Sequence, residues 1–434
     1  MRTMFAILLV IDTFGSTLSA ESPLEEDGIQ NNGTVAEGPV AVPPPTEEAV
    51  RYYRTGIAWW GFNKVWELVL PAIILFTGLS AVIRARAQRL GRKWFFTIGL
   101  YWVFFIVVLY VVNWPLSFYL GYVRQHAYGM SNQTFQKWLL DSLISRGVLA
   151  AFGFAFLWIP YLLLSKSPRR WWLYTGLLMV PFLTLMMFVM PVWIDPLYND
   201  FGPMKDKALE QRILALAESA GIEGSRVYEV EKSVDTKAIN AYVTGFHDTK
   251  RIVLWDTIIA KLETDELLFV MAHEMGHYVL GHVVQGIFFF SALILVGLYF
   301  AHRIAWSLLR RFSDRFGFDQ ISDVASVPLM LIALNVAMLV LEPVGLAYSR
   351  HIERESDRFA LELTRDNQAA AEAFVKLSTE NLGYPDPGWL MTVLRASHPP
   401  IADRVAFCNE YRPWSEGEPL RYGDRFPADL ETAR

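Results

Sequence analysis

The chain has 434 residues, of which 53% are hydrophobic and 19% are charged, including 15 Trp and 29 Phe. This composition is typical of a membrane protein, not of a small soluble domain. The formal net charge is −5 and basic residues cluster only beside apolar segments, so nucleic acid is not an expected partner. The single cysteine, Cys408, leaves no intramolecular disulfide to form.

The first 60 residues differ in character from the rest of the chain. Residues 1–20 combine a basic start, an apolar core and a small-residue end, which predicts a cleavable signal peptide. The alternative is an uncleaved first transmembrane helix, which Asp12 within the apolar stretch makes less favourable. Residues 21–60 are rich in Glu, Gly and Pro and are expected to form a disordered acidic tether.

Six apolar runs are each long enough to cross a bilayer, which requires about 20 residues. They are residues 66–83, 94–114, 146–164, 171–192, 283–301 and 326–347. The first four define a predicted membrane domain at 61–194, and the last two define a transmembrane hairpin at 283–347. Glu342 lies near the end of the last run, so we expect it to line a polar chamber or to reach the membrane interface.

The most informative motif is His273-Glu274-Met275-Gly276-His277, which reads H-E-x-x-H. Thr264 as N-cap and apolar residues at helical spacing predict a helix through the motif. Two histidines four apart share one helix face and can hold a single zinc ion. Glu274 can then act as general base for a zinc-activated water. Because so short a pattern also occurs by chance, a helix with two surface histidines is the alternative.

A zinc hydrolase needs three protein ligands and one open position. The acidic run 349–360 contains the candidates for the third ligand. Glu353 and Asp357 are four apart, so one carboxylate can bind zinc while the other orients a ligand histidine. Glu355 and His351 also carry ligand-type side chains, but the spacing favours Glu353 with Asp357. A solvated helix with surface ion pairs is the alternative interpretation.

Short strands are expected before the motif, at residues 227–230 and 252–255, with residues 240–244 beside them. After the motif, His398 precedes two prolines, which hold its backbone extended or in a turn. There it could stabilise the oxyanion of a tetrahedral intermediate, or it could be an ordinary loop histidine. The other histidines considered are expected at polar surfaces or interfaces: His126, His247, His282 and His302.

Together these stretches resemble the integral-membrane CAAX prenyl endopeptidases and their bacterial relatives, a branch of the gluzincin metallopeptidases. The resemblance extends from about Trp66 to Arg404. Residues 114–119, 128–134, 194–201, 240–242, 250–257, 273–277, 349–360 and 397–400 carry it, in one order. The implied fold is mainly α: a polytopic transmembrane helix bundle with a gluzincin-like α+β zinc-protease domain. Two transmembrane helices would split that domain into residues 195–282 and 348–434.

The resemblance also implies roles for individual residues. Glu353 would be the third ligand of one Zn²⁺ per chain, together with His273 and His277. Asp357 would support these ligands without binding the ion itself. His398 would act in catalysis and Arg404 would bind the substrate near the metal. The edge strand that holds the substrate backbone would consist of Asn240, Ala241 and Tyr242.

The expected function is therefore that of a membrane-embedded zinc metalloendopeptidase, CAAX prenyl protease-like, with Glu274 as general base. Its partners would be membrane lipid and a peptide or protein substrate, lipidated or not. One alternative is a membrane-protein quality-control zinc protease that acts on non-prenylated substrates. Another is an inactive scaffold, although the presence of every expected ligand argues against it.

Lys and Arg in short loops predict the orientation in the membrane. The basic loops 84–93, 165–170 and 302–325 fall on one side of six alternating spans, so the tether and both catalytic segments fall on the other. The rule thus predicts an extracytoplasmic catalytic side. The membrane would be the inner membrane of a bacterium or the endoplasmic reticulum of a eukaryote. This orientation departs from the resemblance, because the eukaryotic prenyl proteases face the cytosol.

Overall fold

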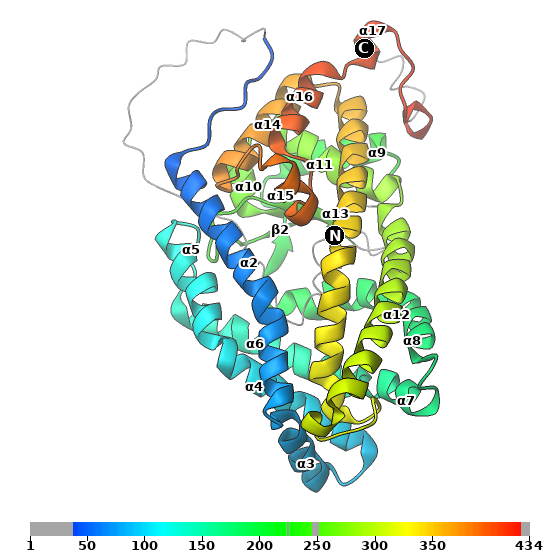
Figure 1. Cartoon of the computed structure of the whole chain (residues 1–434). Coiled ribbons are helices and arrows are strands. Elements are labelled where there is room, and N and C mark those ends of the chain that lie inside the picture. The colour runs from blue at the N-terminus through cyan, green and yellow to red at the C-terminus, as the bar shows by residue number, and fades with distance from the viewer. Residues whose placement is uncertain (1–37, 223, 225, 245–250, 427–434) are drawn as a thin grey trace.

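The computed structural model describes residues 38–222, 224, 226–244 and 251–426. The predicted signal peptide, residues 21–37 of the tether, and His247 lie outside the described residues. Figure 1 shows a bundle of long helices below and a smaller mixed α and β part above. The chain passes from one part to the other several times, so segments distant in sequence meet at the boundary.

The first described helix, α2 (Glu47–Phe76), begins earlier than expected. Thr46 caps it by accepting a hydrogen bond from the backbone N–H of Ala49. Residues 47–60, expected to belong to the disordered tether, are therefore helical. The predicted end of the tether at residue 60 is wrong. The acidic residues Glu47 and Glu48 were assigned to a disordered segment, but they follow the Thr46 cap and stabilise the first turn of α2.

Five helices of the described part are long and apolar enough to cross a membrane. They are Trp94–Ala127, Phe135–Lys166, Trp171–Leu197, His282–Phe316 and Val324–Thr364. α2 and α3 (Leu79–Gly91) meet the same length and apolarity criteria only as a pair, and they meet at an angle of 65°. The predicted run 66–83 crosses this bend, where Gly78 adopts φ 75°.

The spans are built from shorter elements. They are α4 (Trp94–Phe118), η1 (Tyr119–Val123), α5 (Arg124–Ala127), α6 (Phe135–Phe156), α7 (Trp158–Lys166), α8 (Trp171–Val189), η2 (Met190–Ile194), η3 (Asp195–Leu197), α12 (His282–Phe316), η5 (Val324–Ser326) and α13 (Val327–Thr364). Glu342 of α13 points into the bundle and pairs with Lys64 of α2, Nζ to Oε2 at 2.7 Å. Such pairing is the usual way to accommodate charges at membrane depth.

The three basic loops meet at the end of the bundle remote from the sheet, where α3 and α7 lie in Figure 1. Arg84 pairs with Asp323 and donates a hydrogen bond to the carbonyl of Gly317. The hydroxyl groups of Tyr161 in α7 and Ser326 in η5, which adjoin the other two basic loops, lie 2.9 Å apart. These loops therefore share one side of the bundle, as their alternation along the chain predicted.

The opposite end of the bundle carries the α and β part. Its four strands are β1 (Phe201–Pro203), β2 (Arg226–Val230), β3 (Ala241–Thr244) and β4 (Arg251–Trp255), in the order β1-β2-β4-β3. β2 and β4 are parallel, and the other two pairings are antiparallel. The helices are α9 (Lys207–Ser219), α10 (Asp256–Lys261), α11 (Thr264–Val279), α14 (Asn367–Glu380), α15 (Gly388–Arg395), α16 (Ile401–Glu410), α17 (Pro413–Glu416) and η6 (Gly423–Arg425).

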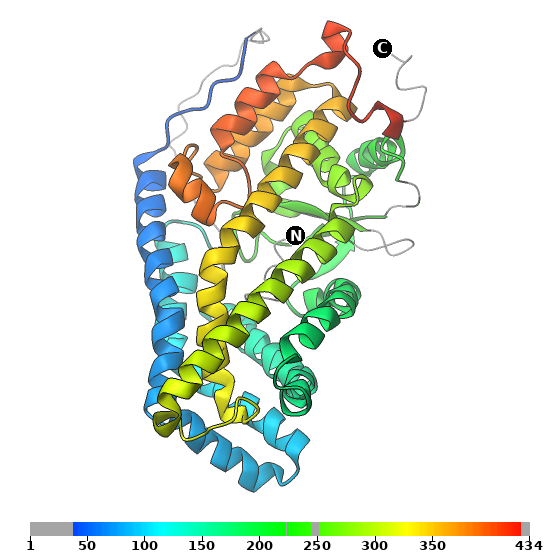
Figure 2. The same ribbon diagram turned by 45° about the vertical axis from the view of Figure 1, so that its right-hand side comes forward.

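Two long helices connect the parts. Figure 2 shows α12 and α13 running side by side from the membrane bundle toward the sheet. α13 has 38 residues, so at about 1.5 Å per residue it can cross the bilayer and continue into the core of the catalytic part. There it packs closely on α11, because a Cβ on Gly276 would lie 3.0 Å from the Phe359 ring.

The segment before α2 lies on the catalytic part. The backbone N–H of Val40 donates to Oδ1 of Asn409, and Nδ2 of Asn409 donates to the carbonyl of Val40, each at 2.9 Å. Asn409 belongs to α16, so residues 38–46 and both catalytic segments share one end of the molecule.

Candidate active site

Helix α11 presents the H-E-x-x-H motif from the centre of the catalytic part. Its N-terminus is closed by a capping box between Glu263 and Glu266, with the N–H of Glu263 2.7 Å from Oε2 of Glu266. Thr264, expected as the cap, is instead the first helical residue. The helix buries its apolar face against α9, α13, α14 and β3, which holds the motif rigidly.

Three potential metal ligands converge between α11 and α13. Nε2 of His273 lies 3.2 Å from Nε2 of His277. The carboxylate of Glu353 faces both rings, with Oε2 3.3 Å from His273 Nε2 and Oε1 3.5 Å from His277 Nε2. The ligand atoms of all three residues lie within 4.8 Å of one another. The structure therefore brings together the two imidazoles that spacing placed on one helix face and the Glu353 carboxylate that the resemblance implied as third ligand.

The environment of these three side chains fits a cation. Oε2 of Glu353 is buried and receives no hydrogen bond from the described residues. Burial would lower the pKa of His273, but contacts with Asp357 and Glu353 more than offset it and raise that pKa to about 10. The pocket thus stabilises positive charge, which a divalent metal ion also provides. Two imidazoles and one carboxylate form a donor set typical of zinc.

Asp357 lies behind His273, one helical turn beyond Glu353. Its Oδ1 is 2.8 Å from His273 Nδ1, the ring nitrogen that faces away from the ligand cluster. Arg404 of α16 donates to the same carboxylate, with Nε 2.9 Å from Oδ2. The guanidinium carbon also lies 3.9 Å from the centre of the Phe374 ring.

The substrate-binding role expected for Arg404 does not fit this position. The residue is only 8% exposed, and two of its nitrogens are used by Asp357. Its contacts instead make it part of the support beneath the ligand cluster. Sequence order could not separate these roles, since both place Arg404 near the metal.

Glu274 and His398 border the ligand cluster. Glu274 is partly exposed, and its carboxylate makes no hydrogen bond or ion pair with the described residues. Nε2 of His398 lies 3.4 Å from Oε1 of Glu353, and the ring is held by a 2.9 Å contact between Nδ1 and Ser397 Oγ. The His398 side chain is 40% exposed, so it is the solvent-accessible side chain next to a mostly buried cluster.

β3 occupies the edge of the sheet next to α11. Within the described strands it pairs only with β4, and Ala241 lies opposite Leu254 in the register. Asn240 precedes the strand, is exposed, and its carbonyl accepts a hydrogen bond from the Trp255 N–H at 3.1 Å. Tyr242 follows within the strand. An edge strand beside the metal helix has the position that an extended peptide requires.

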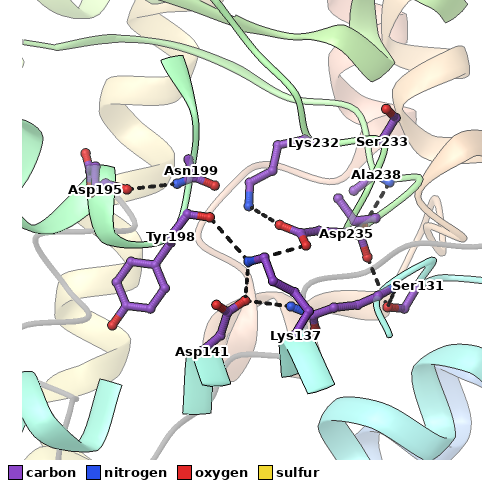
Figure 3. Close-up of polar contacts among 12 residues, drawn as sticks. Ser131, Lys137, Asp141, Asp195, Tyr198, Asn199, Lys232, Ser233, Asp235 and Ala238 are labelled. Carbon is purple, nitrogen blue, oxygen red and sulfur yellow. Dashed lines mark hydrogen bonds and ion pairs between the residues drawn. The ribbon is translucent and has the colours of Figure 1, made fainter. Parts of the chain in front are cut away.

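A polar cluster anchors the loop before β3 to the membrane part (Figure 3). Lys137, at the start of α6, contacts Asp141 at 2.7 Å and Asp235 at 3.6 Å. Lys232 reaches the same Asp235 at 3.1 Å, and the Ser131 hydroxyl donates to the Asp235 carbonyl. The loop that leads into β3 is therefore held by side chains from both parts.

The expectation that His282 lies at a polar surface or interface is wrong. This histidine is fully buried, and its Nδ1 lies 3.0 Å from Nδ1 of the candidate ligand His277. Its Nε2 faces Glu355, which therefore points away from the ligand cluster, as spacing predicted. His351 contacts the same Glu355 from a more exposed position. In the sequence, the glycine directly before His282 was the signal of a helix break there.

Comparison with known proteins covers both parts of the chain. Residues 203–412 match peptidase family M48, and residues 46–200 match the CAAX prenyl protease N-terminal family, described as five membrane helices. An uncharacterised metalloprotease of Bacillus subtilis, YhfN, is 35% identical, with 89% of this chain and 90% of the relative covered. A CAAX prenyl protease 1 homolog of Dictyostelium discoideum is 30% identical, with 70% and 71% covered.

The crystal structure of Ste24p from S. mikatae has the same fold. It aligns with a TM-score of 0.71 at 23% identity and covers 83% of this chain and 87% of that chain. A membrane helix bundle that carries an H-E-x-x-H helix and a third candidate ligand on a spanning helix defines a membrane-embedded metallopeptidase. The chain belongs to peptidase family M48.

This assignment confirms the predicted resemblance, fold class and enzyme class. The protein is an integral membrane enzyme of CAAX prenyl protease-like type and acts on peptide or protein substrates. Its family requires a metal ion, which the three converging ligands can hold.

Proposed function

We propose that this protein is a zinc-dependent endopeptidase that cleaves peptide bonds where its membrane bundle meets the catalytic part. The observation that carries the proposal is the buried carboxylate of Glu353: its Oε1 and Oε2 each face one imidazole nitrogen, and Oε2 lacks a hydrogen bond among the described residues. Such an atom costs free energy unless a cation satisfies it.

His273, His277 and Glu353 would hold the ion, each through one atom. A zinc ion at this position supplies a Lewis acid that polarises a carbonyl group and makes water nucleophilic near neutral pH. Asp357 would keep His273 in the tautomer whose Nε2 lone pair faces the metal. Arg404 would in turn keep the Asp357 carboxylate ionised and in place.

Glu274 would move the protons. It adjoins His273 in sequence and its carboxylate has no partner among the described residues, so it is free to accept a proton from the attacking water. The same carboxyl group would then donate that proton to the leaving amine. His398, the solvent-accessible side chain next to the cluster, would donate a hydrogen bond to the oxyanion that develops on the scissile carbonyl.

The substrate would bind as an additional strand. Asn240, Ala241 and Tyr242 would supply backbone hydrogen-bonding groups along the edge of the sheet, which orients the scissile bond toward the ligand cluster. This assignment is supported by the packing of β3 on α11.

The relatives named CAAX prenyl proteases suggest the substrate class. We propose that the substrate is a peptide with a lipidated cysteine near its C-terminus, whose chain lies in the catalytic part while its lipid contacts the bundle. Cleavage of a farnesylated CAAX peptide in preference to the unmodified peptide would support this class. Equal cleavage of both would favour a quality-control protease instead, and cleavage of neither would favour a scaffold.

The proposed catalytic side of the membrane is extracytoplasmic. The support is electrostatic: the basic loops gather at the end of the bundle opposite the catalytic part, and such loops favour the cytoplasm. Alkaline phosphatase fused after Asp200, at the catalytic end, should be active. Inactive phosphatase there, with an active cytoplasmic reporter at the same point, would reverse the orientation.

Metal analysis combined with one variant tests the central proposal. The purified full-length protein should contain one zinc ion per chain and cleave a peptide. Glu353→Gln should lose the ion and the activity together. Retention of zinc and activity by that variant would contradict the proposed metal centre.

A further inference from the structure

His282 is a buried imidazole next to the candidate metal site that the proposed mechanism does not yet use. Its side chain is 0% exposed, and its Nδ1 lies 3.0 Å from His277 Nδ1. The hydroxyl of Ser356 is a more distant neighbour, 3.4 Å from the same nitrogen. On the other side of the ring, Glu355 Oε2 lies 3.5 Å from His282 Nε2.

The break between α11 and α12 creates this contact. In a continuous helix a residue five positions on is rotated by about 140° from the first, so His282 would point away from His277. Gly281 adopts φ 70°, a left-handed conformation that ends α11 and starts α12 in a new direction. The break brings the His282 ring next to the His277 ring.

The geometry also determines where the protons lie. His277 Nε2 faces Glu353 and His273, so it must carry a lone pair to bind a metal. Its proton is then on Nδ1, which can donate only if His282 Nδ1 accepts. His282 therefore carries its own proton on Nε2, the nitrogen that faces the Glu355 carboxylate.

The carboxylate of Glu355 favours this arrangement because an ionised carboxylate attracts an N–H group and repels a nitrogen lone pair. The C-terminal segment holds Glu355 in turn. The Tyr422 hydroxyl lies 3.3 Å and the Arg421 Nη2 lies 3.4 Å from its Oε1. A chain of contacts thus runs from the C-terminal segment through Glu355 and His282 to the metal ligand.

We propose that His282 is a positioning residue for the metal ligand His277. The negative charge of Glu355, 3.5 Å from His282 Nε2 but without a hydrogen bond to it, favours the tautomer with the proton on that nitrogen. The inference rests on the proposed metal centre. Each ligand histidine then has its own support: His273 is backed by the Asp357 carboxylate, and His277 by a neutral imidazole. Groups that orient ligand histidines in this way contribute roughly 10–100-fold to metal affinity.

The test measures zinc affinity of the full-length protein by competition with a chromogenic chelator. His282→Phe keeps an aromatic ring but removes the acceptor, and should weaken zinc binding by about 10–100-fold. His282→Asn restores an acceptor near the position of Nδ1 and should recover most of that loss. His351→Ala is the matched control, because it removes an imidazole that also contacts Glu355 but not His277, and it should bind zinc normally.

Other outcomes overturn the inference. Wild-type affinity in His282→Phe would exclude a positioning role. Equal losses in the Phe and Asn variants, with an equally lowered Tm of the metal-free protein, would show that His282 only fills space. If the wild-type protein binds zinc no better than Glu353→Gln, the metal centre itself is wrong and this inference falls with it.

Discussion

Oδ1 of Asp357 lies 2.8 Å from Nδ1 of His273, and the guanidinium of Arg404 donates two hydrogen bonds to the same carboxylate. Each of these three residues is at least nine-tenths buried. A charge pair enclosed in this way is costly to break, because removal of one partner leaves the other ionised without compensation. The support beneath the candidate ligand is therefore a structural element as well as a chemical one.

Removal of the guanidinium alone should destabilise the protein. We expect Arg404→Gln to lower the free energy of unfolding by about 3–5 kcal/mol, since Asp357 stays buried without its partner. The double variant Arg404→Gln/Asp357→Asn leaves no uncompensated charge and should recover a large part of this loss. Thermal unfolding of the metal-free variants measures the effect. Additive destabilisation in the double variant would show that the two residues do not act as a pair.

Glu274→Gln should abolish peptide cleavage while zinc remains bound. The amide cannot accept a proton, and loss of a general base typically costs about 10²–10⁴-fold in kcat. Glu410→Gln, an exposed position on α16, is the matched control and should cleave normally. Peptidase assays and measurements of zinc content on both variants test whether Glu274 is the general base. Near-normal turnover in Glu274→Gln would assign the base elsewhere.

His398 should act on the transition state and not on the metal. Loss of one oxyanion donor costs roughly 10²–10³-fold in kcat, so His398→Ala should show that drop with KM and zinc affinity nearly unchanged. Ser397→Ala removes the 2.9 Å contact to His398 Nδ1 and should produce a smaller decrease in kcat. A variant that loses zinc instead would identify His398 as part of the metal site.

The polar cluster of Figure 3 should matter for substrate binding, because it holds the loop that leads into β3. Lys137→Met removes the contacts to Asp141 and Asp235, and we expect KM to rise several-fold with kcat and zinc affinity little changed. Lys205→Met is a suitable control, since it also removes two carboxylate contacts but at a side chain that is 67% exposed. Equal KM values for Lys137→Met and wild type would show that this cluster does not contribute to substrate binding.

Much of the fold was predictable because its signals are local. The apolar runs identified the membrane helices, and the H-E-x-x-H motif placed His273 and His277 on one face of α11. The spacing of Glu353 and Asp357 was equally local, since residues four apart share one face of any helix. The errors arose where composition masked a cap, as at Thr46, or where a predicted span crossed a bend, as at Gly78.

The sequence by itself determined the chemistry that this protein can perform, since residue types and helical periodicity define a metal site and its membrane setting. Only the tertiary structure decided how that site is supported. Arg404 lies buried behind the candidate ligands, because α16 packs its side chain against Asp357 and Phe374. His282 reaches His277 because the left-handed conformation of Gly281 breaks the chain into two helices between them. Such contacts depend on how helices pack and where they break, which helical periodicity alone does not encode.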